Sequence, residues 1–542
     1  MQNPFWSTAA KPLIGHSRRE FFRRGALATA TLALGGRIRR AVAAPLEYGA
    51  NLYRSIGVKT LINAKGTYTI ISGSQTLPEV KRAMDDASRS YVQMDELMDG
   101  VGRRLAELTG AEWGIVTAGC CAALTHCTAA CIAGSNPERM QRLPNLEGLK
   151  SEVVIPAYSR NVYDHAIRML GVKIVTVRDA SELESAFNER TAMAYILGGP
   201  QDDGTLGTRI VAETAKRHNV PVIVDAAAEV LTIPNVHLQR GATAVAYSGG
   251  KCIRGPQAAG LLLGERNLLQ AAWANSAPHH AFGRSLKVGK EEIMGMLAAV
   301  EMWVKRDHQA ETKLWESWLE TISASVKQID GVTTRINQAS TELSNQTPTL
   351  SIQWDGARLG ITGQELSRLL LDTEPRVVLA SAGGSRPGNM SSSASIVPYM
   401  LIPGDEKVIG KRLYAALSSP PKFENPAPPP EGEPAAVAGQ WELKLEFDRG
   451  SATHSLFLEQ QGTKLFGTHR GEFYSGDLNG TVADSTVRFQ SSHQAEGTRL
   501  SYNFTGTADG DTMAGKVNMD EYGEALWRAQ RHQYRAGGRR SR

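Results

Sequence analysis

Short apolar runs alternate with helical patterns from about residue 46 to residue 418. The runs have the length of buried strands, and the segments between them, such as Val101–Leu108 and Val211–His218, repeat apolar side chains with helical spacing. This alternation is typical of an α/β fold with a mostly parallel sheet. The expected strands are Trp113–Val116, Glu152–Ile155, Lys173–Val177, Ala192–Leu197, Val220–Asp225 and Gly260–Leu263.

The pattern changes after the last of these strands. Residues 290–329 form one long helical stretch, and shorter elements follow it. We therefore predict a large domain, residues 45–290, and a smaller α+β domain, residues 291–418. The later elements are two strands and a helix: Pro348–Trp354, Arg376–Ala380 and Glu406–Leu417.

A proline-rich linker, residues 419–438, ends this region, because its seven prolines neither continue a helix nor pair inside a sheet. Beyond it, Trp441–Phe447 alternates strictly between apolar and polar side chains, and similar runs separated by glycines recur as far as Met519. This spacing predicts an antiparallel meander over residues 439–531, either a small closed barrel or a sandwich.

The first 44 residues follow another pattern. Ser17–Arg23 contains paired arginines, Gly25–Gly36 is a short apolar stretch, and Ala41–Ala43 offers small residues to a peptidase. A membrane anchor is the alternative, but twelve apolar residues are fewer than the roughly 20 that a bilayer requires. The pattern resembles a twin-arginine export signal, which predicts a periplasmic protein without a transmembrane segment in its mature chain.

Composition describes an ordinary soluble protein of two or three domains, with 542 residues, 42% hydrophobic and 21% charged. Residues 1–43 hold eight Lys/Arg and one acid, so their removal changes the formal charge from +5 to −2. No broad basic field for nucleic acid remains. The six arginines from Arg528 to Arg542, with the basic tail at residues 532–542, are interpreted as a solvated terminus, an anionic surface partner being the alternative.

Lys251 lies in the glycine-rich segment Ala246–Gln257, downstream of Asp225, which ends an expected strand. This arrangement is what pyridoxal phosphate (PLP) chemistry needs. The lysine amine holds the cofactor aldehyde as a Schiff base, and the aspartate keeps the pyridine nitrogen protonated. The alternative is a strand-ending acid and a solvated loop lysine. Order, spacing and flanking strands together favour the cofactor interpretation.

A second glycine turn predicts the phosphate site. Gly119 and Cys120 follow the strand Trp113–Val116 and open an alanine-rich helix, whose N-terminal N–H groups attract anions. We expect both residues to contact the cofactor phosphate. Ser248, three residues before the lysine, is a further candidate, with an ordinary turn serine as the alternative.

Four of the five cysteines, at positions 120, 121, 127 and 131, crowd one helix, and Cys252 adjoins the lysine. Their spacing matches no zinc framework, so we expect no metal and interpret them as small buried residues.

Three cations, Arg284, Lys287 and Lys290, precede the long helix. They either form a plain basic surface or bind the substrate anion or cofactor phosphate of a neighbouring subunit. Glu229 is interpreted as a solvated loop acid.

These motifs resemble the selenocysteine synthase (L-seryl-tRNA selenium transferase) superfamily of fold-type I PLP enzymes, and within it the branch of the D-glucosaminate-6-phosphate ammonia-lyases. The resemblance covers about Tyr48–Leu417 and implies Lys251 as the Schiff-base lysine, Asp225 as the ring-nitrogen partner, and Gly119 with its neighbours at the phosphate. The chain departs from the family in Cys120 and Cys121, where small residues are usual. The segments that carry the resemblance are Asn63–Gly66, Glu107–Glu112, Asp225–Glu229, Ser248–Gln257 and Lys287–Glu292.

The resemblance implies a PLP-dependent lyase or transferase. We expect an ammonia-lyase that performs α,β-elimination on an amino acid or amino sugar acid, assembled as a homodimer or larger homo-oligomer. Transamination, racemisation and seleno- or sulfo-group transfer remain alternatives, because all begin with the same carbanion. No nucleic-acid partner is expected, since an exported protein does not meet seryl-tRNA. From another class of function, the chain could be an exported binding protein whose β domain docks to a glycan, a lipid or a partner.

Overall fold

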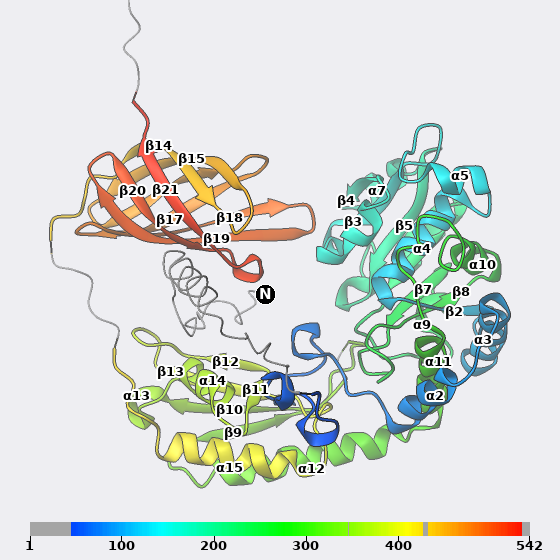
Figure 1. Cartoon of the computed structure of the whole chain (residues 1–542), viewed down its shortest axis with the longest axis horizontal. Helices are drawn as coiled ribbons and strands as arrows, with labels where there is room; N and C mark the ends of the chain where they lie inside the picture. The colour runs from blue at the N-terminus through cyan, green and yellow to red at the C-terminus, as the bar shows by residue number, and fades with distance from the viewer. Residues whose placement is uncertain (1–44, 345, 426–431, 534–542) are drawn as a thin grey trace, which may run out of the picture. The chain divides into compact units, whose positions relative to one another are not determined.

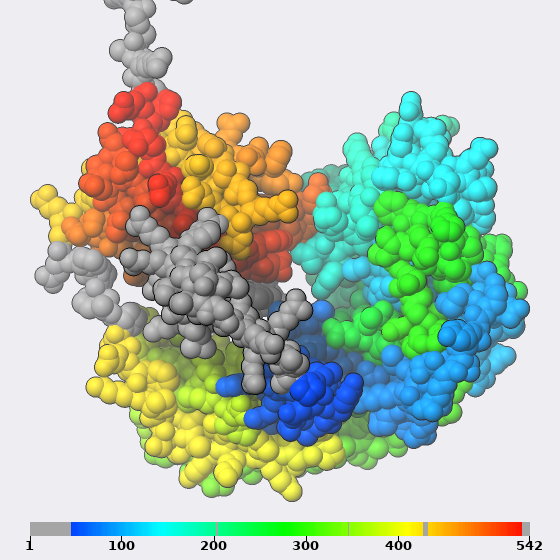
Figure 2. All heavy atoms as spheres, viewed as in Figure 1, coloured from blue at the N-terminus to red at the C-terminus, as the bar shows by residue number. Residues whose placement is uncertain are grey.

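The computed structural model describes residues 45–533 apart from residue 345 and residues 426–431. The described residues divide into two units, one built from residues 61–425 and one that contains the C-terminal β domain with residues 45–60 (Figures 1 and 2). The expected export signal and residues 534–542 of the basic tail lie outside the described residues. Within the part of the chain that is described, no helix is both long and apolar enough to cross a membrane.

A seven-stranded sheet forms the centre of the large domain, in the order β2-β8-β7-β6-β5-β3-β4. β8 runs antiparallel to its neighbours β2 and β7, and the other pairs are parallel. Most strand residues are buried, because helices cover both faces of the sheet. The strands are β2 (Trp113–Thr117), β3 (Glu152–Pro156), β4 (Lys173–Val177), β5 (Thr191–Leu197), β6 (Val222–Asp225), β7 (Ala244–Ser248) and β8 (Gly260–Gly264).

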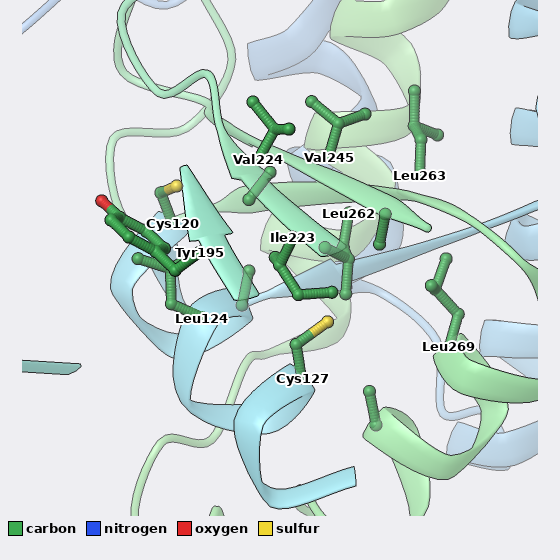
Figure 3. Packing of buried hydrophobic residues seen from close by; sticks show 14 of the residues in the cluster. Cys120, Leu124, Cys127, Tyr195, Ile223, Val224, Val245, Leu262, Leu263 and Leu269 are labelled. Carbon is green, nitrogen blue, oxygen red and sulfur yellow. The ribbon is translucent and has the colours of Figure 1, made fainter. Parts of the chain in front are cut away.

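The cysteine-bearing helix α4 (Gly119–Ala133) is a core helix, because most of its residues are buried and it packs on β8, β7, β6 and β5. Figure 3 shows Cys120, Leu124 and Cys127 of α4 facing the sheet residues Ile223 and Leu262. Small side chains allow this close approach. The other helices of the domain are α2 (Pro78–Ser88), α3 (Met94–Thr109), α5 (Pro137–Arg142), α6 (His165–Arg168), α7 (Ala180–Ala186), α8 (Thr208–Arg217), α9 (Val236–Gln239), α10 (Arg266–Ala274) and α11 (Lys290–Lys305).

The long helical stretch expected after residue 290 is two helices, α11 and α12 (His308–Val326). The break is stabilised by Asp307, whose side chain accepts hydrogen bonds from Gln309 N and Ala310 N at the start of α12. A four-stranded antiparallel sheet in the order β12-β13-β10-β9 follows, and β11 pairs in parallel with β1. The elements are β1 (Ile62–Ala64), β9 (Thr333–Asn337), β10 (Thr349–Asp355), β11 (Val377–Leu379), β12 (Ser381–Gly383), β13 (Ser391–Ile396), α13 (Gly356–Leu359), α14 (Gly363–Asp372) and α15 (Asp405–Ser418).

The C-terminal domain is a closed antiparallel barrel of eight strands in sequence order. The last strand, β21, pairs with β14 and closes the barrel, which excludes a sandwich. β21 contains Arg528 and Arg531, so these two arginines belong to the barrel and not to the solvated terminus that the sequence suggested. The strands are β14 (Gly439–Glu446), β15 (Ser451–Gln461), β16 (Lys464–Arg470), β17 (Ser475–Ala483), β18 (Thr486–Ala495), β19 (Thr498–Asp509), β20 (Thr512–Asn518) and β21 (Glu524–Arg531).

Three histidines lie buried side by side inside the barrel. His454 Nδ1 is 2.8 Å from His469 Nε2, and His469 Nδ1 is 2.7 Å from Ser491 Oγ. The rings of His469 and His493 are 4.5 Å apart. Burial and the neighbouring imidazoles lower the pKa of His469 to about 2, so the ring is neutral at physiological pH. The three rings therefore form a neutral polar cluster next to the apolar barrel core.

Candidate active site

Lys251 is placed by a tight glycine turn after β7. A Cβ atom on Gly249 would lie 2.5 Å from Pro256 O, and one on Gly250 would lie 2.9 Å from Gln257 Cγ, so the turn accepts only glycine at these two positions. The Lys251 Nζ atom donates a hydrogen bond to Thr67 O at 2.6 Å. Burial lowers the pKa of Lys251. A larger share of the amine is therefore neutral and nucleophilic.

Asp225 ends β6 with a carboxylate that is buried and oriented by three donors. Its Oδ2 atom accepts a hydrogen bond from Tyr195 Oη at 3.0 Å, and its Oδ1 atom accepts from Ala227 N at 3.1 Å and from the Cys120 thiol at 3.5 Å. Figure 3 shows Cys120 and Tyr195 close together above α4. Burial raises the pKa of Asp225, and the hydrogen bonds oppose that effect. A nearby cation, such as a protonated ring nitrogen, would stabilise the ionised form.

The turn before α4 has the geometry of an anion cradle. Gly119 begins the helix with φ 83°, and a Cβ atom there would meet nothing within 4 Å, so space is open beside the first N–H groups of α4. The turn packs closely against Gly260 on β8. A Cβ atom at Gly260 would lie 2.4 Å from the Gly119 carbonyl carbon, so this approach requires glycine. Ser248 ends β7 just before the lysine turn. A half-buried amine, a buried carboxylate and an open helix N-terminus therefore fit the aldehyde, ring nitrogen and phosphate of PLP.

The three cations expected to bind an anion are not part of this arrangement within the one chain. Arg284 and Lys287 are exposed, and Lys290 forms an ion pair with Glu291 at the start of α11. A binding role for them requires a neighbouring subunit, as the sequence analysis supposed, and stays a prediction.

Glu229 corrects an expectation. Instead of a solvated loop acid, it is 2% exposed, and its Oε2 atom is 2.5 Å from His237 Nε2. The reason is a turn in which Glu229 N donates to Ala226 O at 3.0 Å and brings the side chain back into the protein. The Cys252 thiol donates to Glu229 O at 3.2 Å, which ties this turn to the lysine turn.

Two contacts of the site were not found from the sequence. Tyr195 lies on β5, two residues before Leu197, which pairs with Asp225 of β6. Because neighbouring parallel strands end at the same edge, a polar side chain near the end of β5 was a usable signal. Thr67 lies far upstream and offers no such signal. Among the described residues, no group of three or more His, Cys, Asp or Glu side chains is arranged to hold a metal ion.

No protein-family model matches the chain. The chain is 29% identical over 331 residues to the D-glucosaminate-6-phosphate ammonia lyase of Salmonella typhimurium, a match that covers 59% of this chain and 86% of the relative. It is 30% identical over 305 residues to the 5'-C-glycyluridine monooxygenase-decarboxylase of a Streptomyces species, covering 53% and 73%. An L-seryl-tRNA(Sec) selenium transferase of Proteus mirabilis is 24% identical over 292 residues, covering 46% and 58%.

The solved structure of a D-glucosaminate-6-phosphate ammonia-lyase superposes with a TM-score of 0.60 and 27% identity, over 68% of this chain and 98% of that one. Fold and site together define a fold-type I PLP-dependent enzyme. Within that class, the chain belongs to the same family as the 5'-C-glycyluridine monooxygenase-decarboxylase, and it is also similar to the D-glucosaminate-6-phosphate ammonia-lyases and the L-seryl-tRNA selenium transferase. The resemblance and the fold class predicted from the sequence are confirmed, and nothing in these comparisons supports the alternative of an exported binding protein.

Proposed function

We propose that the chain binds PLP at Lys251, Asp225 and the Gly119 turn, and acts as an ammonia-lyase on an amino acid or amino sugar acid. The observation that carries the proposal is that these features lie together. Cys120, next to Gly119 at the start of α4, contacts Asp225 at the end of β6, and Lys251 follows β7, the strand that pairs with β6. The relative named as an ammonia lyase, which this chain covers over 86% of its length, supports the choice of reaction.

The bound cofactor would supply an electron sink for negative charge on the carbon that bears the substrate amine. Lys251 would hold the cofactor aldehyde and, once the substrate amine replaces it, take the proton from that carbon with its free amine. Asp225 would keep a proton on the ring nitrogen, and Tyr195 would fix the direction of its carboxylate. The helix N-terminus at Gly119 and Cys120, with Ser248, would hold the phosphate. A substituent on the neighbouring carbon would then leave, and ammonia would follow.

The reaction is tested by supplying the purified, PLP-loaded protein with single amino acids and amino sugar acids and no keto acid. Elimination is expected to release ammonia and a 2-keto acid in equal amounts, because no second substrate is required. Both products would be followed by coupled enzyme assays, with protein that has been stripped of PLP as the control. Turnover that strictly requires an added keto acid would contradict elimination and indicate transamination.

For the assembly, we propose at least a homodimer in which Arg284, Lys287 and Lys290 complete the anion site of a neighbouring subunit. If so, Lys251→Ala and Arg284→Ala proteins are each inactive alone, and mixing them should restore part of the turnover through hybrid interfaces. Analytical ultracentrifugation of the mixture gives the subunit number. A monomer that keeps full turnover on dilution would rule the arrangement out.

We also propose that the protein reaches the periplasm by the twin-arginine route. Ser17–Arg23 and the small residues Ala41–Ala43 support the proposal. N-terminal sequencing of protein recovered from the periplasmic fraction is expected to begin close to residue 44. Recovery of an uncleaved cytoplasmic chain as the main product would refute it.

A further inference from the structure

A cavity of about 260 Å³ adjoins the Lys251 turn. Thr67, whose carbonyl accepts the lysine hydrogen bond, and Cys252, the residue after the lysine, line one side of it. Trp315 and Tyr399 line another side from the smaller domain. A molecule that fills this space therefore lies beside the lysine turn and contacts residues of the smaller domain.

The cavity wall carries a net positive charge. Its charged side chains are Arg254, Arg306 and Glu311. Glu311 neutralises the positive charge of Arg306, because the Nε and Nη2 atoms of Arg306 donate to its two carboxylate oxygens at 2.9 Å. The Nη1 atom of Arg306 donates to Cys252 O at 3.3 Å. Arg254 makes no direct ion pair among the described residues, and the carboxylates of Glu311 and Glu79 act on it only through space.

The Arg254 side chain makes one hydrogen bond within the described part of the chain, from Nε to Gln75 O at 3.0 Å. The two terminal nitrogens of its guanidinium therefore keep their donors available. Burial and the nearby Arg306 lower the pKa of Arg254, and the charges of Glu311 and Glu79 oppose that effect only in part. An arginine stays charged at any physiological pH. A partly desolvated cation of this kind is stabilised by an anion.

The backbone at Arg254 gives a second, independent indication of function. Its φ is 58°, in the left-handed region that costs a residue with a side chain about 1 kcal/mol relative to glycine. The turn imposes this conformation, because Arg254 N donates to Lys251 O at 2.9 Å and Leu77 N donates to Arg254 O at 3.2 Å. Glycine would relieve the strain, yet the chain places a long cation there.

We propose that Arg254 binds a carboxylate or phosphate group of the substrate in this cavity and so positions the substrate amine at Lys251. The guanidinium offers the paired donors that both oxyanions accept. His308, Thr312 and Thr347 supply polar groups to the same cavity, and Trp303 supplies an apolar wall. This inference rests on the proposed function and adds to it the group that selects an anionic substrate.

The test exploits the strain at Arg254. An Arg254→Gly protein loses the cation while the turn becomes easier to form, so we expect an unchanged or higher Tm and unchanged visible absorbance from bound PLP. Calorimetric titration of the PLP-loaded protein with D-gluconate and, separately, with inorganic phosphate should show at least about tenfold weaker binding than the unaltered protein. Because the cofactor phosphate occupies the Gly119 turn in the loaded protein, these titrations report on the cavity.

Two further variants complete the test. Arg254→Lys keeps the charge but loses the paired donors, and should recover part of the affinity. Arg266→Gln, which removes an arginine that stacks on Trp113 outside the cavity wall, should bind both anions as the unaltered protein does. Tighter binding of gluconate would identify a substrate carboxylate, and tighter binding of phosphate would identify a phosphate ester.

Equal affinities in the unaltered and Arg254→Gly proteins would overturn the inference, and so would the absence of measurable binding of both anions to the unaltered protein. Neither result would contradict the proposed elimination reaction, which the ammonia assay tests independently. Conversely, anion binding that depends on Arg254 would stand even if the products showed transamination in place of elimination.

Discussion

Lys251→Ala is expected to remove the visible absorbance band of the purified protein and to lower turnover at least about 10⁴-fold, as the loss of a covalent catalytic group does. The change would delete both the amine proposed to hold the cofactor and the base proposed to take the substrate proton. It should not disturb the fold, because among the described residues Lys251 Nζ makes a single hydrogen bond, to Thr67 O. Absorbance spectra and steady-state rates measure the two effects.

Lys305→Ala is the matched control, because Lys305 is an exposed lysine of the same unit whose one ion pair within residues 45–533, as far as these are described, is with Glu301 on α11. Its absorbance and turnover should equal those of the unaltered protein. An unaltered protein that stays colourless after incubation with PLP would refute the cofactor assignment itself.

Asp225→Asn is expected to lower turnover by about 10²–10³-fold while the protein keeps bound PLP. The amide has the size of the carboxylate and can still accept a hydrogen bond from Tyr195, but it has no negative charge to keep a proton on the ring nitrogen. The cofactor would remain attached through Lys251 and the phosphate turn. Bound PLP is measured by its release in alkali, and turnover by the ammonia assay.

The comparison for this prediction is Glu152→Gln, which removes another buried carboxylate from the same sheet. Glu152 lies at the start of β3, 5% exposed, and bonds to Arg190 and Asn188. Its loss should lower the Tm and leave turnover within a few-fold of the original. Wild-type turnover in Asp225→Asn would exclude a role for this carboxylate at the ring nitrogen.

The parts of the fold that could be predicted from the sequence are those with a local pattern of apolar and polar residues. The six expected strands of the large domain lie within two residues of their observed ends, because each is a compact apolar run. The strand β7 was not predicted, because small residues dominate Ala244–Ser248 and give little contrast between apolar and polar positions. β21 was missed because its alternation merges with an arginine-rich end, although its pairing with β14 closes the barrel.

The same distinction separates the site residues that were predicted from those that were not. Lys251, Asp225 and Gly119 stand in short motifs whose neighbours are close in sequence. Thr67 reaches them only through tertiary structure, and Tyr195 could be predicted only from its place near the end of β5, the strand beside β6. The backbone strain at Arg254 could not be predicted either, because a residue's type does not determine its φ angle.

The five cysteines have a consequence for the chemical durability of the protein. All are free thiols, and burial raises the pKa of each, that of Cys131 and Cys252 to about 12. Oxidants and alkylating agents attack the thiolate, which is scarce at neutral pH when the pKa is this high. The buried thiols, the Cys120 donor to Asp225 among them, can therefore stay reduced in air and in an oxidising compartment without the protection of a disulfide.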